Sequence, residues 1–273
     1  MNTASRIDTT FQRLRQAGRK GLIGYLTAGD PDLETSLKDL RSAIASGIDL
    51  LELGVPFSDA TADGPTIQEA SQRALASGMT VGGALDIVRE LRRDQELPIV
   101  LFGYANPFYR YGFERLARDA AGAGADGLLV VDMPFEESTE LRRCLKAAGL
   151  AFIYLAAPTT PPDRARLMLR DATGFVYYIM VTGVTGARDD LAPDVAEHVA
   201  TLRRCTSLPV AVGFGISRGE QARAAGAAAD AVVVGSALIK AARDGRLAAL
   251  VDELRAGLDA AAPRTGGPDG DAR

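Results

Sequence analysis

The sequence contains few of the residues that most often carry metal or disulfide chemistry. Its 273 residues include one histidine and two cysteines. Cys144 and Cys205 lie far apart in helix-like segments and match no metal-binding or redox spacing, so we expect reduced thiols of core type. The one histidine, His198, belongs to the helical segment DVAEHVATL, where a packed or surface role is expected. A site built on histidine ligands is therefore not expected.

Lysine is also scarce, and its positions argue against Schiff-base catalysis. Such an enzyme needs a lysine that faces the substrate. Lys20 precedes the first expected strand, and the other lysines lie within helical patterns, at Lys38, Lys146 and Lys240. The sequence has no G-x-S-x-G elbow, and neither cysteine has a histidine available to it. Carboxylates remain as the candidate catalytic groups.

Long apolar runs and excess positive charge are absent too. No run reaches the roughly 18 apolar residues that a membrane-spanning helix needs. The segment MNTASRIDTTFQRLRQAGRKG is polar and lacks the apolar core of a signal peptide. The net charge of -4 gives no electrostatic footprint for nucleic acid or an anionic membrane. We expect a cytoplasmic protein that binds neither nucleic acid nor membrane.

Short apolar runs, rich in β-branched residues, alternate regularly with longer amphipathic segments. Nearly continuous apolar runs are typical of parallel strands that are buried on both faces. The expected strands are residues 21–26, 49–55, 98–104, 127–132, 151–156, 174–181, 209–214 and 231–236. Eight strand–helix units favour a single-domain α/β fold, the TIM (β/α)8 barrel, over an open doubly wound sheet.

Capping residues and composition mark further boundaries. A helix is expected over residues 32–47, with Asp32 as N-cap and Gly47 as its stop, and another over residues 237–258. Residues 5–17 predict an extra N-terminal helix before the first strand. Residues 1–260 are expected to form the catalytic barrel domain, and the Gly/Pro-rich residues 261–273 a disordered C-terminal tail.

Two acids stand out in the segment LELGVPFSDATADGPTIQ. Glu52 lies near the end of an apolar strand, and Asp63 lies in the loop that follows it. If Glu52 points into a barrel mouth, desolvation raises its pKa, which suits a residue that both gives and takes a proton. The alternatives are an ion pair between Glu52 and an arginine, and an Asp63 that caps the next helix.

Small residues follow the sixth, seventh and eighth expected strands. The segments are VTGVTGARDD (181–190), VGFGIS (212–217) and VVGSAL (233–238). Exposed backbone N–H groups with a helix N-terminus behind them bind phosphate, and barrels often place phosphate in this region. Tight turns are the alternative explanation for any single segment. Three segments in adjacent units favour an anion site, to which Ser236 adds a hydroxyl.

Motifs along the whole chain resemble those of one family. The segments SRID, YLTAGDP, LELGVPFSD, ADGPTIQ, YANP, VVDMPFEE, APTTP, TGVTGA, GFGIS and VVGSALIK occur in that order. They are similar to the signatures of the tryptophan synthase alpha chain family, and the resemblance covers residues 5–258.

This resemblance implies a lyase that acts without a metal or a Schiff base. The family is a TIM barrel that cleaves indole-3-glycerol phosphate to indole and D-glyceraldehyde 3-phosphate by a retro-aldol step. The resemblance gives Glu52 the role of general acid/base, and Asp63 that of hydrogen-bond acceptor for the indole N–H. It also implies no cofactor in this chain, because pyridoxal phosphate belongs to a partner beta chain in an alpha2-beta2 complex that makes tryptophan.

The resemblance also implies which residues bind the substrate. The indole pocket is expected at Tyr25, Phe102, Ile153 and Phe214, with Tyr177 facing the mouth. The phosphate site is expected at Gly186, Gly215, Gly235 and Ser236, and Thr185 is expected to help close the site.

The chain departs from the family pattern at a few positions. Ala60 and Thr61 stand where the family usually has proline and leucine, in the loop that contacts the partner, so a less rigid loop is expected. The other departures are Gly24, Phe102 and Met180. Three alternatives remain open. They are a stand-alone lyase that releases free indole, a non-catalytic regulatory paralogue, and another barrel isomerase that handles phosphate.

Overall fold

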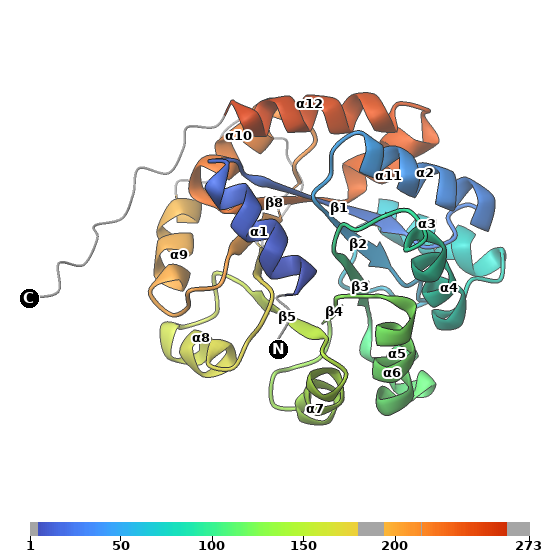
Figure 1. Ribbon diagram of the computed structural model, residues 1–273, viewed down its shortest axis with the longest axis horizontal. Coiled ribbons are helices and arrows are strands. Elements are labelled where there is room, and N and C mark those ends of the chain that lie inside the picture. Colours follow the sequence, from blue (N-terminus) through green and yellow to red (C-terminus); the bar gives the residue numbers. More distant parts are fainter. Residues whose placement is uncertain (1–4, 180–193, 214, 261–273) are drawn as a thin grey trace, which may run out of the picture.

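Eight parallel strands close into a barrel in sequence order, with β1 beside β8 (Figure 1). The structure is a computed structural model that describes residues 5–179, 194–213 and 215–260. The strands are β1 (Gly21–Thr27), β2 (Leu50–Gly54), β3 (Ile99–Gly103), β4 (Gly127–Val130), β5 (Ala151–Ala156), β6 (Val176–Ile179), β7 (Val210–Gly213) and β8 (Ala231–Val234). The TIM-barrel prediction is confirmed, although several strands are shorter than the apolar runs that predicted them.

Helices surround the barrel (Figure 1). They are α2 (Leu33–Ala45), α3 (Pro65–Ala76), α4 (Val81–Leu91), α5 (Ala105–Tyr111), α6 (Phe113–Ala123), α7 (Thr139–Ala147), α8 (Pro162–Leu169), α9 (Asp194–Arg203), α10 (Gly219–Ala228), α11 (Ser236–Arg243) and α12 (Leu247–Asp259). Asp32 caps α2 as expected, because its Oδ1 accepts the Thr35 N–H at 2.9 Å. In the part of the chain that the structure describes, none of the helices has the length and hydropathy for crossing a membrane.

The last helical segment is divided, which corrects the single helix expected over residues 237–258. Helix α11 ends at Arg243 and α12 begins at Leu247. Between them Gly245 has a φ of 67°, in the left-handed region that glycine adopts without strain, and its N–H donates to the Ala242 carbonyl at 3.1 Å. Helix-favouring residues flank this turn on both sides, and the Asp244–Gly245 pair was the available signal for the break.

The extra N-terminal helix α1 (Arg6–Gln16) covers the end of the barrel where the strands begin. Ser5 caps it by accepting the Asp8 N–H at 3.1 Å. Its buried Phe11 packs against Phe175, next to the start of β6, with ring centroids 5.8 Å apart. Its buried Leu14 lies close to Gly21, the first residue of β1. In Figure 1 this helix lies in front of the strands.

Three aspartates at the same end tie neighbouring strands together. Asp49, Asp126 and Asp230 each directly precede a strand, and each carboxylate accepts a backbone N–H from the start of the strand before it. Asp49 accepts the Leu22 N–H at 2.9 Å, Asp126 accepts the Ile99 N–H at 2.8 Å, and Asp230 accepts the Val210 N–H at 2.9 Å. This end of a TIM barrel is associated with stability, whereas catalysis belongs to the opposite end.

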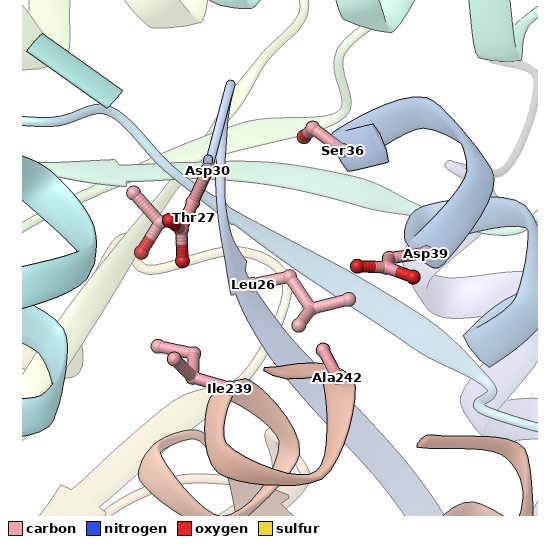
Figure 2. Close-up of a pocket in the computed structure, with 7 residues that line it drawn as sticks. All are labelled: Leu26, Thr27, Asp30, Ser36, Asp39, Ile239 and Ala242. Atoms are coloured by element: carbon pink, nitrogen blue, oxygen red, sulfur yellow. The ribbon is translucent and has the colours of Figure 1, made fainter. Parts of the chain in front are cut away.

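Two cavities among the described residues are lined by neither Glu52 nor Asp63. One of about 10 Å³, the size of a single water molecule, lies between the end of β1 and helices α2 and α11 (Figure 2). It is lined by Leu26, Thr27, Asp30, Ser36, Asp39, Ile239 and Ala242. The other, of about 160 Å³, lies beside α1 and is lined by Phe11, Leu14, Arg15, Gly18, Arg19, Lys20, Pro209 and Asp230. The first is too small for a substrate, and the second is at the end where the strands begin.

Candidate active site

Glu52 is a fully buried acid on the third residue of β2. Its side chain is 0% exposed, and neither carboxylate oxygen has a hydrogen-bond partner among the described residues. Burial raises the pKa of Glu52 to about 8. The ion pair with an arginine that the sequence left open is therefore not formed by any described residue. The acid is poised to change its protonation state close to neutral pH.

The aromatic neighbours of Glu52 show that it faces the barrel interior. Glu52 is in register with Tyr25 of β1, and side chains paired in this way point to the same face of the sheet. Tyr25 packs edge-on against Phe102 of β3 at 5.0 Å. A Cβ placed on Gly54 would lie 2.2 Å from the Tyr25 hydroxyl, so only glycine leaves room for that side chain. Tyr25, Glu52 and Phe102 thus share the interior near the C-terminal ends of the strands.

Tyr177 of β6 occupies a matching position across the barrel. A Cβ on Gly213 of β7 would lie 2.2 Å from the Tyr177 hydroxyl. Burial first, and then the charges of Glu52 and Asp63, raise the pKa of Tyr177 well above its ordinary value. Burial and the charges of the same two acids also raise the pKa of Tyr25. Both tyrosines therefore remain protonated, and both acids lie close enough to the tyrosines to act on them electrostatically.

Asp63 lies in the loop between β2 and α3, which is fixed by its own hydrogen bonds. The Asp63 N–H donates to the Ala60 carbonyl at 3.1 Å. The Gln68 amide donates to the Asp63 carbonyl at 2.8 Å and to the Ala60 carbonyl at 3.1 Å. Helix α3 has Gly64 as its N-cap and no side-chain cap bond, so Asp63 does not serve as the cap that the sequence left open.

Ala60 and Thr61, the departures from the family pattern, differ in their surroundings. Ala60 is buried, with 4% of its surface exposed, and its carbonyl accepts two of the bonds that close the loop. Thr61 is exposed, and its N–H donates to the Asp59 carbonyl at 2.8 Å. Backbone bonding thus closes this loop without a proline.

Tyr104, which is not among the residues predicted for the site, contacts Asp63 directly. Its hydroxyl donates to Asp63 Oδ2 at 2.8 Å and accepts the Ala62 N–H at 3.1 Å. Burial raises the pKa of Asp63, and the hydrogen bond from Tyr104 acts in the opposite direction. In the sequence, a tyrosine directly after an apolar strand is normally interpreted as a core residue. The available signal was its place in the YANP segment, at the C-terminal end of a barrel strand.

Part of the expected phosphate site is described. Gly215 follows β7 with a φ of 45°, Gly235 follows β8, and Ser236 is the exposed first residue of α11. The first-turn N–H groups of a helix have no partner within the helix and can bind an anion. A Cβ on Gly235 would lie 3.5 Å from Tyr25, so Gly235 adjoins the same mouth. Thr185, Gly186 and Phe214, together with Met180, lie outside the described residues.

Ile153 is placed less directly at the mouth than the other candidates. It is 1% exposed and in register with Leu129 of β4. A Cβ on Gly174 would lie 2.8 Å from Ile153 Cδ1 and 3.5 Å from the Ile7 side chain of α1. Ile153 therefore reaches toward the end of the barrel that α1 covers.

The scarce residue types lie where the sequence predicted, with one exception. His198, on the outer helix α9, stacks on Tyr178 with ring centroids 5.9 Å apart. The buried Lys20 donates to the Ala229 carbonyl at the end of the barrel where the strands begin. Cys144 is a buried free thiol, but Cys205 lies just beyond α9 and is partly exposed, which corrects the core-type expectation for it. Across the described ranges, no group of three or more His, Cys, Asp or Glu residues could hold a metal ion.

Comparison with known proteins agrees with this arrangement. Residues 11–258 match the family model described as tryptophan synthase alpha chain. The tryptophan synthase alpha chain of Geobacter sp. (strain M21) is 52% identical over 236 residues, which cover 86% of this chain and 88% of the relative. That of Caulobacter vibrioides (strain NA1000 / CB15N) is 52% identical over 238 residues, covering 87% and 86%.

A solved structure of Mycobacterium tuberculosis tryptophan synthase has the same fold. One of its chains superposes with a TM-score of 0.88 at 37% identity, covering 93% of this chain and 98% of its own length. With the closed barrel and the two acids at its mouth, these matches lead to one conclusion. The chain belongs to the tryptophan synthase alpha chain family.

Proposed function

We propose that this chain cleaves indole-3-glycerol phosphate to indole and D-glyceraldehyde 3-phosphate, as the alpha subunit of tryptophan synthase, with Glu52 and Asp63 as the catalytic residues. The residue assignment rests on the burial of the Glu52 carboxyl without a hydrogen-bond partner among the described residues. A fully buried carboxyl with no hydrogen-bond partner among the described residues is costly, and such groups occur mainly at functional sites.

Glu52 is suited to move a proton twice. In its acid form it protonates C3 of the indole ring, which leaves a positive charge at the ring nitrogen. The bond between C3 and the glycerol carbon then breaks, and its electron pair restores the aromatic indole. The glycerol hydroxyl loses its proton to the Glu52 carboxylate as its carbon becomes the aldehyde. A pKa of about 8 supports both roles, because acid and base forms are both present near neutral pH.

Asp63 is suited to stabilise the charged ring. A carboxylate that accepts the indole N–H becomes a stronger partner as the nitrogen gains positive charge, so it favours the intermediate over the ground state. The hydrogen bonds around Asp63 support this role, because they fix its backbone, and one from Tyr104 holds its carboxylate.

The remaining candidates are assigned to substrate binding. Tyr25, Phe102, Tyr177 and Phe214 form the apolar surroundings of the indole ring, and Thr185 helps close the site. Ile153 is assigned to the floor of this pocket, because its side chain extends toward the end that α1 covers. The phosphate is bound by Gly186, Gly215, Gly235 and Ser236. Among the described residues, the contacts of Tyr25 with Phe102 and Gly235 support these assignments. The assignments of the other residues rest on the family resemblance.

A beta chain is the partner that family membership implies. We propose that the two chains form an alpha2-beta2 complex in the cytoplasm. In this complex pyridoxal phosphate belongs to the beta chain, and this chain uses no cofactor. The loop with Ala60 and Thr61 is the proposed contact. A stand-alone lyase and a regulatory paralogue are less favoured, because the chain matches the synthase family over most of its length and retains both acids.

The direct test is to incubate the purified chain with indole-3-glycerol phosphate, with and without a beta chain. We expect indole release by the chain alone, a higher rate on mixing, and co-elution of the two chains. Indole release that the beta chain does not change, without co-elution, would instead identify a stand-alone lyase. No indole release in either condition would reject the proposed activity.

A further inference from the structure

Tyr104 holds one of the two oxygens of Asp63. Its hydroxyl donates to Oδ2 at 2.8 Å, and the Asp63 Oδ1 atom takes part in no hydrogen bond with any described residue. The same Tyr104 hydroxyl accepts the Ala62 N–H at 3.1 Å, so its one proton is directed toward the carboxylate. The two oxygens of Asp63 are therefore not equivalent.

The position of Tyr104 is itself fixed. The residue follows β3 directly, is 3% exposed, and packs on Phe57 with ring centroids 5.3 Å apart. The next residue, Ala105, donates its N–H to Asp132 Oδ1 at 2.7 Å, which anchors the start of α5. The hydroxyl thus reaches Asp63 from a barrel strand rather than from a free loop.

The backbone of Asp63 is held separately. The Gln68 amide donates to its carbonyl at 2.8 Å, and its own N–H donates to Ala60. With the backbone and Oδ2 both held, Oδ1 is the carboxylate oxygen that has no hydrogen-bond partner among the described residues.

We propose that Tyr104 is a positioning residue of the lyase reaction, which by holding Asp63 Oδ2 directs Oδ1 toward the N–H of the substrate's indole ring. This inference rests on the proposed function and deepens it. Tyr104 acts through Asp63 and needs no contact with the reacting atoms.

The protonation states agree with this role. Burial, followed by the charge of Asp63, raises the pKa of Tyr104, so its hydroxyl keeps the proton that it donates. In return, its hydrogen bond lowers the pKa of Asp63 against the effect of burial. Tyr104 therefore keeps Asp63 ionised to lower pH than burial alone would allow.

Tyr104→Phe removes the hydroxyl and keeps the ring that packs on Phe57. We expect kcat to fall about 10- to 100-fold, as for the loss of a hydrogen bond to a charged group, with a smaller change in KM. Because the pKa of Asp63 rises, the acid limb of the kcat/KM profile should move to higher pH. In an Asp63→Asn background the same change should have little further effect.

Tyr111→Phe is the matched control. The Tyr111 hydroxyl also donates to a carboxylate, Asp119 Oδ2 at 2.9 Å, but between helices α5 and α6. This variant should leave kcat and the pH profile unchanged, and thermal unfolding of both variants would show whether they fold. If Tyr104→Phe does not fold, 3-fluorotyrosine at position 104 is a second test, since its more acidic hydroxyl should move the acid limb to lower pH.

Failure of the inference is distinguishable from failure of the proposed function. If the wild-type chain cleaves indole-3-glycerol phosphate but folded Tyr104→Phe keeps the wild-type kcat and acid limb, the positioning role is wrong. An unmoved acid limb in the 3-fluorotyrosine protein would also overturn it. A wild-type chain that releases no indole would reject the proposed function itself.

Discussion

At the scale of single residues, Glu52 costs the fold stability when it is charged. Its carboxyl is 0% exposed and its pKa is about 8, against an ordinary value of 4.5. Between these two values the folded chain holds a proton that the unfolded chain releases. The free energy of unfolding therefore falls as pH rises across this window, by roughly 3 kcal/mol between pH 5 and pH 8 for this group.

Glu52→Gln should remove this pH dependence. We expect the free energy of unfolding of the variant, relative to wild type, to increase by roughly 3 kcal/mol from pH 5 to pH 8, because glutamine does not ionise. Urea unfolding at both pH values measures it. The difference between the pH values is the decisive quantity, since the buried amide adds a constant cost at each. A constant offset between the two proteins would show that Glu52 titrates normally in the fold.

The two acids proposed as the catalytic pair are visible in the sequence, whereas the contacts that position them are not. An acid within an apolar strand and a second acid in the next loop are visible in the residue pattern, and the motif resemblance adds their roles. Tyr104 is not visible in this way, because its function depends on a loop from the preceding unit coming within 2.8 Å of its hydroxyl. Likewise, only the packing shows that Gly54 makes room for the Tyr25 hydroxyl.

At the scale of elements, hydrogen bonds between neighbouring strands stabilise the base of the barrel, where the strands begin. The Asp126 carboxylate accepts the Ile99 N–H at 2.8 Å. It also accepts hydrogen bonds from the guanidinium groups of Arg92 at 2.6 Å and Arg6 at 3.1 Å. The Asp126 and Arg92 side chains are only 5% and 10% exposed. Asp49 and Asp230 make corresponding bonds before β2 and β8. The short segments GID, GAD and AAD before these strands were the available signal in the sequence.

Asp126→Ala should destabilise the barrel without altering the chemistry. Loss of the carboxylate leaves the largely buried Arg92 and the Ile99 N–H without this partner, so we expect the free energy of unfolding to fall by about 3–5 kcal/mol. Asp163→Ala is the control, because its ion pair with Arg166 is exposed and should contribute nothing measurable. Urea unfolding and kcat at a permissive temperature test both variants. A large loss of kcat in folded Asp126→Ala would contradict the separation of base from mouth.

Element boundaries were the weaker part of the sequence prediction, for a physical reason. Apolar periodicity shows which face of a helix is buried but does not mark where the helix ends, and at Gly245 two helices replace the expected one. Strand ends were extended in the same way, since apolar residues continue beyond the paired ladder. Helix starts were predicted well where a side chain accepts a first-turn N–H, as Asp32 does at α2.

At the scale of the whole molecule, the barrel separates two tasks. The C-terminal ends of the strands gather Glu52, the two tyrosines and the glycines after β7 and β8, while α1 and the base aspartates close the other end. Eight strand–helix units predicted this closure. The assignment of residues 1–260 to one domain and of 261–273 to a disordered tail stays a prediction, since the tail lies outside the described residues.

The most direct measurement is indole release from indole-3-glycerol phosphate by wild type and Glu52→Gln, paired with calorimetric binding of the same substrate. Glutamine keeps the size of the side chain but cannot give and take the proton. We predict a fall in turnover of about 10² to 10⁴, with a substrate Kd within a few-fold of wild type. Turnover at the wild-type rate in folded Glu52→Gln would contradict the account.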